Sequence, residues 1–387
     1  MEHSIGIHRE NYVGGKSNQR DSNIELFRII TMIAIIAHHY VVNSGLIADT
    51  GPIYADPLSW RSIFLFLFGA WGKTGINCFV LITGYFMCKS HITARKFVKL
   101  LFEVMFYQIV IQAIFIVLGY TPLSIPTIVK MTFPVTAIAQ NFTGTYLVFF
   151  LCIPFLNILI TNLQEQQHIY LLLLSGFIYV FFGTLKIMPV TMNYVSWYIV
   201  LYLIASYIRL YPKKIFESRR VWGWMTVAVL LLSVLSVIIC VWLGMLLEKN
   251  MAYFFVTDSN TFLAVLTGVS AFMFFKNVRL NYSKVINTIS ATTFGVLLIH
   301  TNSDAMRQWL WKDVLDNVGV YNSVWMPLHA IGSVVIIFVV CSAIDLLRIK
   351  FLEQPFLIWW DKYWERISRK FKEIERKVCR KLHIFAE

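Results

Sequence analysis

The sequence has few charged residues for its length. Asp, Glu, Lys and Arg make up only 14% of its 387 residues, whereas a soluble domain carries about 25% because it needs them on its surface. Hydrophobic residues reach 58%, and the mean hydropathy is +0.65. So little charge does not suffice to cover a water-facing surface, and the sequence therefore predicts a protein whose solvent is lipid.

Several common motifs are missing as well. The six cysteines are scattered without CxxC or Cys/His spacing, so we expect neither a disulfide framework nor a metal site. No basic stripe alternates with stacking aromatic residues, so the net charge of +13 does not indicate a nucleic-acid partner. The first 23 residues hold no apolar stretch, which argues against a cleavable signal peptide. No bound cofactor is expected either.

Apolar runs long enough to cross a bilayer, about 20 residues each, follow one another along the chain. We place ten of them near residues 24–43, 62–87, 97–119, 145–161, 169–185, 194–211, 222–247, 258–275, 285–303 and 326–348. The predicted fold is all-α, a polytopic transmembrane helical bundle. The chain then divides into a polar cytoplasmic segment (1–23), a membrane domain (24–350) and a basic amphipathic tail (351–387).

The distribution of Lys and Arg predicts the orientation. Counted over alternate loops and the ends of the chain, 26 of these residues fall on one side of the ten predicted spans and 6 on the other. Cytoplasmic loops are the ones enriched in Lys and Arg. Both termini are therefore predicted to be cytoplasmic, as an even number of spans requires.

The tail has a pattern of its own. Seven apolar residues recur there at intervals of three or four, interleaved with basic residues: Trp360, Tyr363, Trp364, Ile367, Phe371, Ile374 and Val378. Such a stripe beside a basic face is typical of a helix that lies on an anionic membrane surface. A helix that packs on a partner subunit would show the same pattern, so a homo-oligomer stays open.

The first predicted span contains the ionisable residues Arg28, His38 and His39, and such residues are costly in lipid and mark functional sites. Arg28 and His39 are 11 residues apart, which places them on one helix face, about 16 Å apart along the axis. His38 points about 80° away from Arg28. Histidine suits proton transfer near neutral pH. Alternatively, Arg28 has no catalytic role and, as an arginine near a helix end, extends its side chain to the membrane–water interface.

Other polar residues lie in or near the predicted spans. Lys73 and Asn77 belong to the second span, Trp197 to the sixth and His300 to the ninth. A cytoplasmic stretch after the second span holds Lys89, Arg95, Lys96 and Lys99, which could hold phosphates. The positive-inside rule alone would also supply these charges, and Trp197 would also fit an interfacial anchor.

Four motifs together resemble the acyltransferase-3 family of integral membrane proteins. Arg28 and His39 match its R-x10-H motif, and CFVLITGYFM (78–87) is similar to its FFVLSGYL-type stretch. FGVLLIH, which ends at His300, resembles YLIH, and Glu353-Gln354-Pro355 resembles the terminal E-x-P. The motifs occur in the order that the family shows, over about residues 20–360.

The resemblance implies an acyl-CoA-dependent O-acyltransferase of the bacterial cytoplasmic (inner) membrane. It would move an acetyl group from acetyl-CoA to a hydroxyl of an extracytoplasmic polysaccharide or lipid-linked glycan. Arg28 and His39 carry over as the catalytic pair, with His39 as base or transient acyl carrier. The residues expected to bind acyl-CoA are Arg28, Lys73, Arg95, Lys96 and Lys99. Those expected to line the cavity or support it are His38, Asn77, Trp197, His300 and Glu353.

One departure from the family pattern sets a limit to the resemblance. The family often carries RxxR after its second helix, whereas Lys96 and Lys99 stand at that spacing here. Lysine binds phosphate as a point charge and lacks the bidentate fork of arginine.

The alternative function is a membrane exporter of glycan precursors, which would use the charged residues inside the membrane as a path for its substrate. The sequence shows no inverted repeat that would favour this alternative.

Overall fold

The computed structural model describes residues 21–133, 142–186 and 193–381, and these residues form helices and connecting turns without a β-strand. The elements run in the order α1 (Ser22–Val42), α2 (Pro52–Ala55), α3 (Trp60–Gly69), α4 (Gly72–Met87), α5 (Ala94–Val117), α6 (Ile125–Thr132), α7 (Phe142–Asn162), α8 (Glu165–Ser175), η1 (Gly176–Phe181), α9 (Phe182–Leu185), α10 (Tyr194–Leu210), η2 (Lys214–Glu217), α11 (Arg219–Leu246), α12 (Phe262–Asn277), α13 (Lys284–Ser290), α14 (Thr293–His300), α15 (Asp304–Arg307), η3 (Gln308–Val314), α16 (Met326–Arg348), η4 (Ile349–Glu353) and α17 (Gln354–Lys381). The prediction of an all-α fold is confirmed for this part of the chain.

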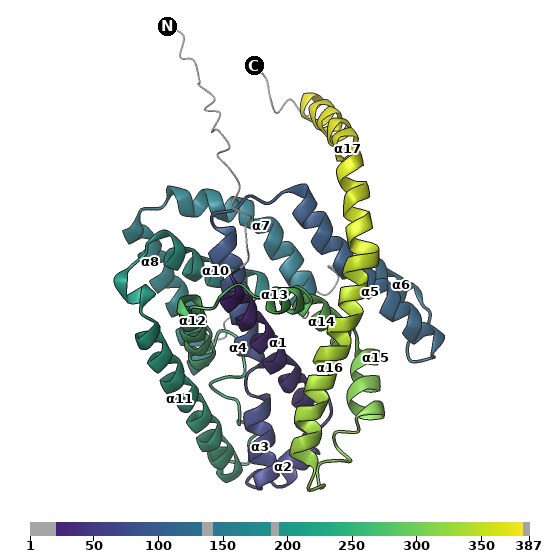
Figure 1. Ribbon diagram of the computed structural model, residues 1–387. Helices are drawn as coiled ribbons and strands as arrows, with labels where there is room; N and C mark the ends of the chain where they lie inside the picture. The colour runs from purple at the N-terminus through teal and green to yellow at the C-terminus, as the bar shows by residue number, and fades with distance from the viewer. Residues whose placement is uncertain (1–20, 134–141, 187–192, 382–387) are drawn as a thin grey trace.

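Helix α1 lies at the centre of the bundle (Figure 1). It packs against α3, α4, α12, α13, α14 and α16. Eleven of its 21 residues are buried, among them Met32, Ile36 and Tyr40 with no exposed surface. A helix that is apolar nearly all round and surrounded by other helices is the expected core of such a bundle.

Seven helices within the described residues are long and apolar enough to cross a membrane. They coincide with the predicted spans one to five, seven and ten. The sixth and eighth predicted spans are shorter apolar helices, α10 and α12. The chain is thus a multi-pass membrane protein by its helix composition, and the number of ten spans stays a prediction.

The ninth predicted span, 285–303, differs from the expectation of one continuous helix. It consists of α13 and α14, which are separated by Ala291 and Thr292. The Thr292 hydroxyl bonds the Ile289 carbonyl at 2.7 Å and the Ser342 hydroxyl at 3.0 Å. Threonine can satisfy backbone groups in this way and so compete with a regular helix.

The predicted boundary between membrane domain and tail, at residue 350, does not coincide with a break in the chain. Helix α16 passes through the π-helical turn η4 directly into α17, which continues in the direction of α16 before it bends (Figure 1). The tail is therefore an extension of the last predicted span rather than a separate helix. Its apolar residues Phe371 and Ile374 are exposed.

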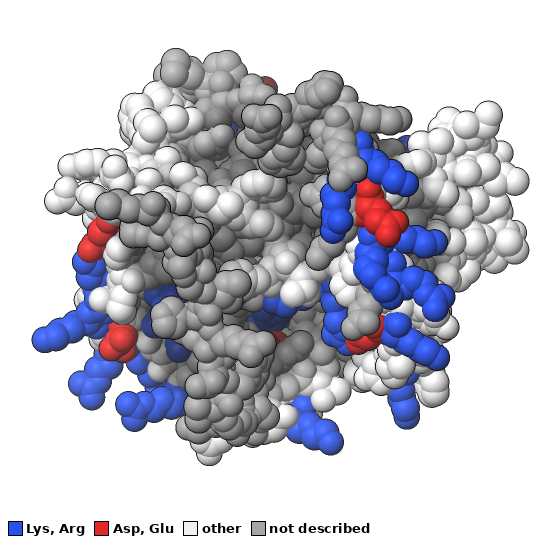
Figure 2. Space-filling model, turned by 90° about the horizontal axis from the view of Figure 1, so that it is seen from above, with Lys and Arg blue, Asp and Glu red and all other residues white. Residues whose placement is uncertain are grey.

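Basic residues gather at the end of the molecule toward which α17 runs. Figure 2 views this end and shows Lys and Arg side chains in separate groups on it. Helix α1 begins in the half of the molecule toward which α17 extends (Figure 1). The basic residues that predict a cytoplasmic side in the sequence thus also lie at one end of the folded molecule.

Reporter fusions test the topology. We expect a reporter after Glu387 or after Arg279 to be active in the cytoplasm, and one near Asp56 or after Lys312 to be active outside, because Lys and Arg are retained inside. The measurement is paired cytoplasmic fluorescence and extracytoplasmic phosphatase activity. Reporters after Arg279 and Lys312 on the same side would mean that the broken pair α13–α14 does not span the membrane.

Candidate active site

A cavity of about 240 Å³ lies at the end of α1 opposite to Ser22. It is lined by Ile35, His38, His39, Val42, Asn43, Gly72, Lys73, Ile76, Phe79, Phe142, Tyr194, Tyr198, Leu297, Thr301 and Arg307. Helices α1, α4, α10 and α14 therefore supply most of its wall. Two of the histidines that the sequence singled out share this one cavity.

A chain of hydrogen bonds fixes the ring of His39. His39 Nδ1 lies 3.0 Å from His300 Nε2, and His300 Nδ1 lies 2.6 Å from the Val296 carbonyl oxygen. A carbonyl oxygen only accepts, so His300 Nδ1 carries the proton and its Nε2, in the neutral ring, is an acceptor. His39 Nδ1 must then donate, which leaves His39 Nε2 with a free lone pair. That nitrogen has no hydrogen-bond partner among the described residues.

His38 is oriented by a helix end. Helix α3 stops at Gly69, so the Gly69 carbonyl has lost its intrahelical donor. His38 Nδ1 lies 2.5 Å from this oxygen and donates to it. Gly72 makes room for the ring, because a Cβ at this position would overlap the imidazole. The helical period predicts that His38 points away from Arg28. Its ring nevertheless lines the same cavity as the ring of His39, and the centroids of these two rings are 5.6 Å apart.

Two cations line the cavity, and no carboxylate does so among its described lining residues. Lys73 Nζ donates to the Tyr194 hydroxyl at 3.0 Å. Arg307 pairs with Asp304 at 2.8 Å, and Asp304 is almost fully exposed. The cavity is therefore suited to negative charge that develops on a bound molecule.

Arg28 does not line this cavity. Its guanidinium lies 3.9 Å from the Glu25 carboxylate, which also accepts a hydrogen bond from the buried Ser290. About a third of the Arg28 side chain is exposed. The shared face of Arg28 and His39 follows from the helix, but the hydrogen-bond partner of His39 is His300.

The basic residues of the stretch around α5 have protein partners. Arg95 pairs with Asp361 at 2.9 Å, and Lys99 pairs with Glu353 at 2.9 Å. Lys96 Nζ donates to the Ser90 hydroxyl and the His91 carbonyl. Their partners lie on the last helix or in the preceding turn, and none of the three lines the His39 cavity.

Glu353 belongs to a buried ion cluster that also holds Arg348. The Arg348 guanidinium contacts Glu103 at 3.0 Å, Asp345 at 2.7 Å and Glu353 at 2.7 Å. The Tyr107 hydroxyl donates to Asp345 at 2.7 Å. The cluster joins α5 to α16 and η4 at the base of the tail, and Glu353 does not line the His39 cavity.

Asn77 and Trp197 are fully buried and bonded to each other. The Trp197 indole N–H donates to the Asn77 side-chain oxygen at 3.0 Å, and Asn77 Nδ2 donates to the Ser259 carbonyl at 2.6 Å. Trp197 has no exposed surface, so it is not an interfacial anchor. The pair joins α4, α10 and the start of α12 beside the cavity without lining it.

Sequence reasoning missed several residues of the cavity wall. Tyr194 and Tyr198 stand one helical turn apart at the start of α10 and face the cavity together. Their spacing of four residues could have indicated this, because residues four apart lie on the same face of a helix. The break between α3 and α4, which frees the Gly69 carbonyl, has the weaker signal of Gly69 and Gly72 flanking Ala70 and Trp71.

The room that Gly72 provides can be tested by substitution. We expect Gly72→Ala to lower stability by about 1–3 kcal/mol, the usual cost of overpacking, because its Cβ would overlap the His38 ring. Gly332→Ala in α16 is the matched control, since a Cβ there meets no atom within 4 Å. Thermal unfolding in detergent measures both. Equal melting temperatures of the Gly72→Ala and Gly332→Ala variants would contradict the close packing of the His38 ring on Gly72.

The buried ion cluster gives a second test. Arg348→Ala leaves the buried Glu103 and Asp345 without their cation and Glu353 with Lys99 alone, and breaking a buried pair in this way costs about 3–5 kcal/mol. Arg95→Ala breaks an exposed pair and should cost at most about 1 kcal/mol. The melting temperature of Arg348→Ala should therefore lie clearly below that of Arg95→Ala. An Arg348→Ala variant as stable as Arg95→Ala would mean that the cluster does not hold α5 against α16.

The acyltransferase domain of the acyltransferase-3 family matches residues 21–346. No match was found among the curated proteins or among the solved structures. The matched range covers most of the chain and includes Arg28, His39 and His300. The chain belongs to the acyltransferase-3 family and is a multi-pass membrane acyltransferase.

Proposed function

We propose that the protein transfers an acyl group, an acetyl group in the first instance, from acyl-CoA to a hydroxyl of an extracytoplasmic polysaccharide or lipid-linked glycan. The observation that carries the proposal is the free Nε2 of His39 in a cavity with two cations. The proposed location is the bacterial cytoplasmic membrane.

The chemistry follows from the tautomer of His39. Its Nε2 removes the proton from the acceptor hydroxyl, and the hydroxyl oxygen attacks the thioester carbonyl. The tetrahedral intermediate then expels the CoA thiolate, which takes the proton from the His39 imidazolium. His39 Nδ1–H stays bonded to His300 throughout, so His300 holds the ring in place. If His39 instead carried the acyl group, the same free nitrogen would be the one acylated.

Lys73 and Arg307 support the same step electrostatically. Negative charge develops on the carbonyl oxygen during attack, and fixed cations in a site that excludes water favour it. Lys73 is bonded to the Tyr194 hydroxyl and Arg307 to the exposed Asp304, so both cations already stand at the cavity before charge develops. This role for Lys73 adds to its expected one in acyl-CoA binding.

The donor and the acceptor are proposed to enter from opposite sides. His39 stands 17 residues beyond Ser22, about 26 Å along α1 by the helical rise. This depth is consistent with a cavity in the half that the charge distribution predicts to be extracytoplasmic, the side proposed for the glycan acceptor. Arg28 is near the start of α1, and we assign it to the CoA phosphates. Arg95 and Lys99 would have to leave an ion pair to contribute.

Purified protein in liposomes, with labelled acetyl-CoA and a surface glycan, tests the proposal. We expect His39→Ala to lower transfer about 100-fold or more, the usual effect of losing a positioned proton-transfer group. His38→Ala should cost less, and Arg28→Ala should mainly weaken acetyl-CoA binding. His300→Phe should cost about tenfold because it removes the acceptor for His39 Nδ1–H.

The conservative variant His300→Gln separates positioning from packing. Its side-chain oxygen can accept from His39 Nδ1–H, so part of the activity should return while acetyl-CoA affinity stays unchanged in both His300 variants. A fully active His39→Ala enzyme beside an inactive His38→Ala enzyme would transfer the role of base to His38. Glycan transport without any transfer of label would favour the exporter instead.

A further inference from the structure

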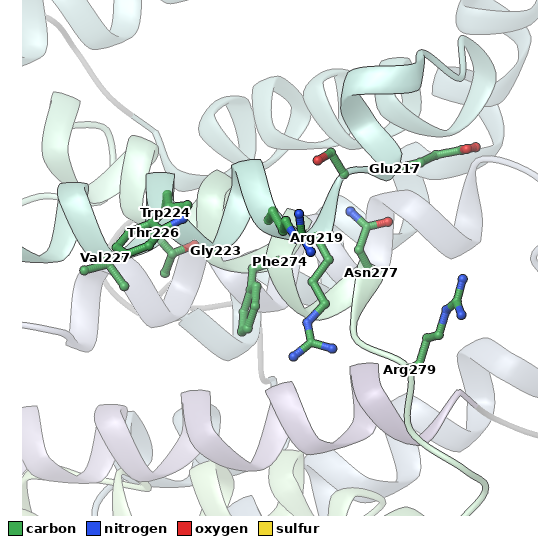
Figure 3. A pocket seen from close by; sticks show the side chains of 11 residues that line it. Glu217, Arg219, Gly223, Trp224, Thr226, Val227, Phe274, Asn277 and Arg279 are labelled. Carbon is green, nitrogen blue, oxygen red and sulfur yellow. The ribbon is translucent and has the colours of Figure 1, made fainter.

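A second and larger cavity, of about 930 Å³, lies between α11 and α12. It is lined by Glu217, Ser218, Arg219, Arg220, Gly223, Trp224, Thr226, Val227, Phe274, Asn277 and Arg279, most of which Figure 3 labels. None of these residues lines the His39 cavity. In the sequence these residues stand out only because some of them are basic and lie on the predicted cytoplasmic side.

Three arginines of this cavity have no protein partner. Arg219, Arg220 and Arg279 form no ion pair, hydrogen bond or ring contact within the part of the chain that the structure describes. Other arginines at this end are engaged, as Arg209 is with the Tyr85 hydroxyl at 2.8 Å. Glu217 also lines the cavity, but Figure 3 shows its carboxylate directed away from Arg219. The cavity therefore carries an excess of positive charge.

An apolar wall continues from the cavity along α11. Phe274 covers Gly223, where a Cβ would lie 3.4 Å from its ring. Trp224 is 76% exposed, and Leu231 and Leu235 are exposed on the same side of the helix. From Trp224 to Leu235 the helix rises about 16 Å, roughly half the thickness of the hydrocarbon core of a bilayer. The stretch from Trp224 to Leu235 thus spans about one lipid leaflet, and the exposed apolar face continues beyond it to Trp242.

We propose that this cavity is a binding site for an anionic phospholipid. The phosphate lies among Arg219, Arg220 and Arg279, whose guanidinium forks match phosphate geometry, and one acyl chain runs along α11 from Trp224 to Leu235. The positive-inside rule accounts for basic residues on this side. It does not account for three unpartnered arginines around one hollow that opens onto an apolar strip. A phosphate with a long apolar tail satisfies both halves of the site.

Native mass spectrometry of the full chain in detergent tests the proposal, with phosphatidylglycerol and phosphatidylcholine of matched acyl chains as probes. We expect wild-type protein to retain one phosphatidylglycerol in preference to phosphatidylcholine. The triple variant Arg219→Ala/Arg220→Ala/Arg279→Ala should reduce that preference at least tenfold, since each basic side chain near an anionic lipid contributes about fivefold. None of the three substitutions removes a contact within the described structure.

The matched control removes three exposed lysines on the same predicted side, Lys89→Ala/Lys214→Ala/Lys284→Ala, and should keep the lipid preference. An equal loss in this control would reduce the site to general attraction between a basic surface and anionic lipid, and would overturn the proposal. Addition of CoA provides the second arm. Displacement of the bound phosphatidylglycerol by CoA at equal concentration would assign the cavity to the acyl donor and would likewise overturn a lipid site.

Discussion

The bundle depends on one constraint, that buried polar side chains of α1 are bonded to other helices, with the Nε2 of His39 left free for chemistry. Water is absent from the centre of a membrane, and an unpaired buried polar group costs about 1–3 kcal/mol. Side chains of α1 accordingly bond to helices far along the chain, joining Ser22 to Asn287, Glu25 to Ser290, His39 to His300 and Tyr40 to His329. These bonds set the rotation of α1 against α13, α14 and α16, and so the position of both histidines.

The same constraint connects the site to the base of the tail. Asp345 packs against Gly295 of α14 so closely that any Cβ at this glycine would overlap the carboxylate. Asp345 is in turn held by Arg348 and Tyr107. His300 lies on the same short helix as Gly295, one and a half turns further along. The ion cluster therefore positions the helix that orients His39, although no member of the cluster lines the cavity.

Much of the helical arrangement was predictable from the sequence, because apolar runs of membrane length are long and unambiguous. The histidines were identifiable because charged or ionisable residues are rare within such runs. The family model supports the functional class. The finer features were not predictable, since they depend on contacts between distant segments. The use of Gly69 as an acceptor for His38, and the burial of Trp197 against Asn77, follow from packing that no local pattern encodes.

Conversely, the division of the ninth span and the continuity of the tail show where length alone misleads. The mostly apolar run at 285–303 reads as one helix, yet α13 ends at Ser290 and α14 begins at Thr293, and between them the Thr292 hydroxyl bonds the Ile289 carbonyl. In the tail the composition changes sharply from apolar to basic, but the backbone stays helical through the π-helical turn η4 and across Pro355. The composition of a segment thus determines whether it lies in lipid or in water, and its backbone hydrogen bonding determines where its helix begins and ends.

The uninterrupted passage from α16 through η4 into α17 has a mechanical consequence. From Met326 to Lys381 the helix contains 56 residues and is roughly 80 Å long, against about 30 Å for the hydrocarbon core. The ion cluster around Arg348 attaches this long helix to α5 at a point part-way along its length. A change of tilt about this point would displace the basic end by an amount that grows with its distance from the cluster, so the packing around Arg348 bears on how far that end stands from the membrane.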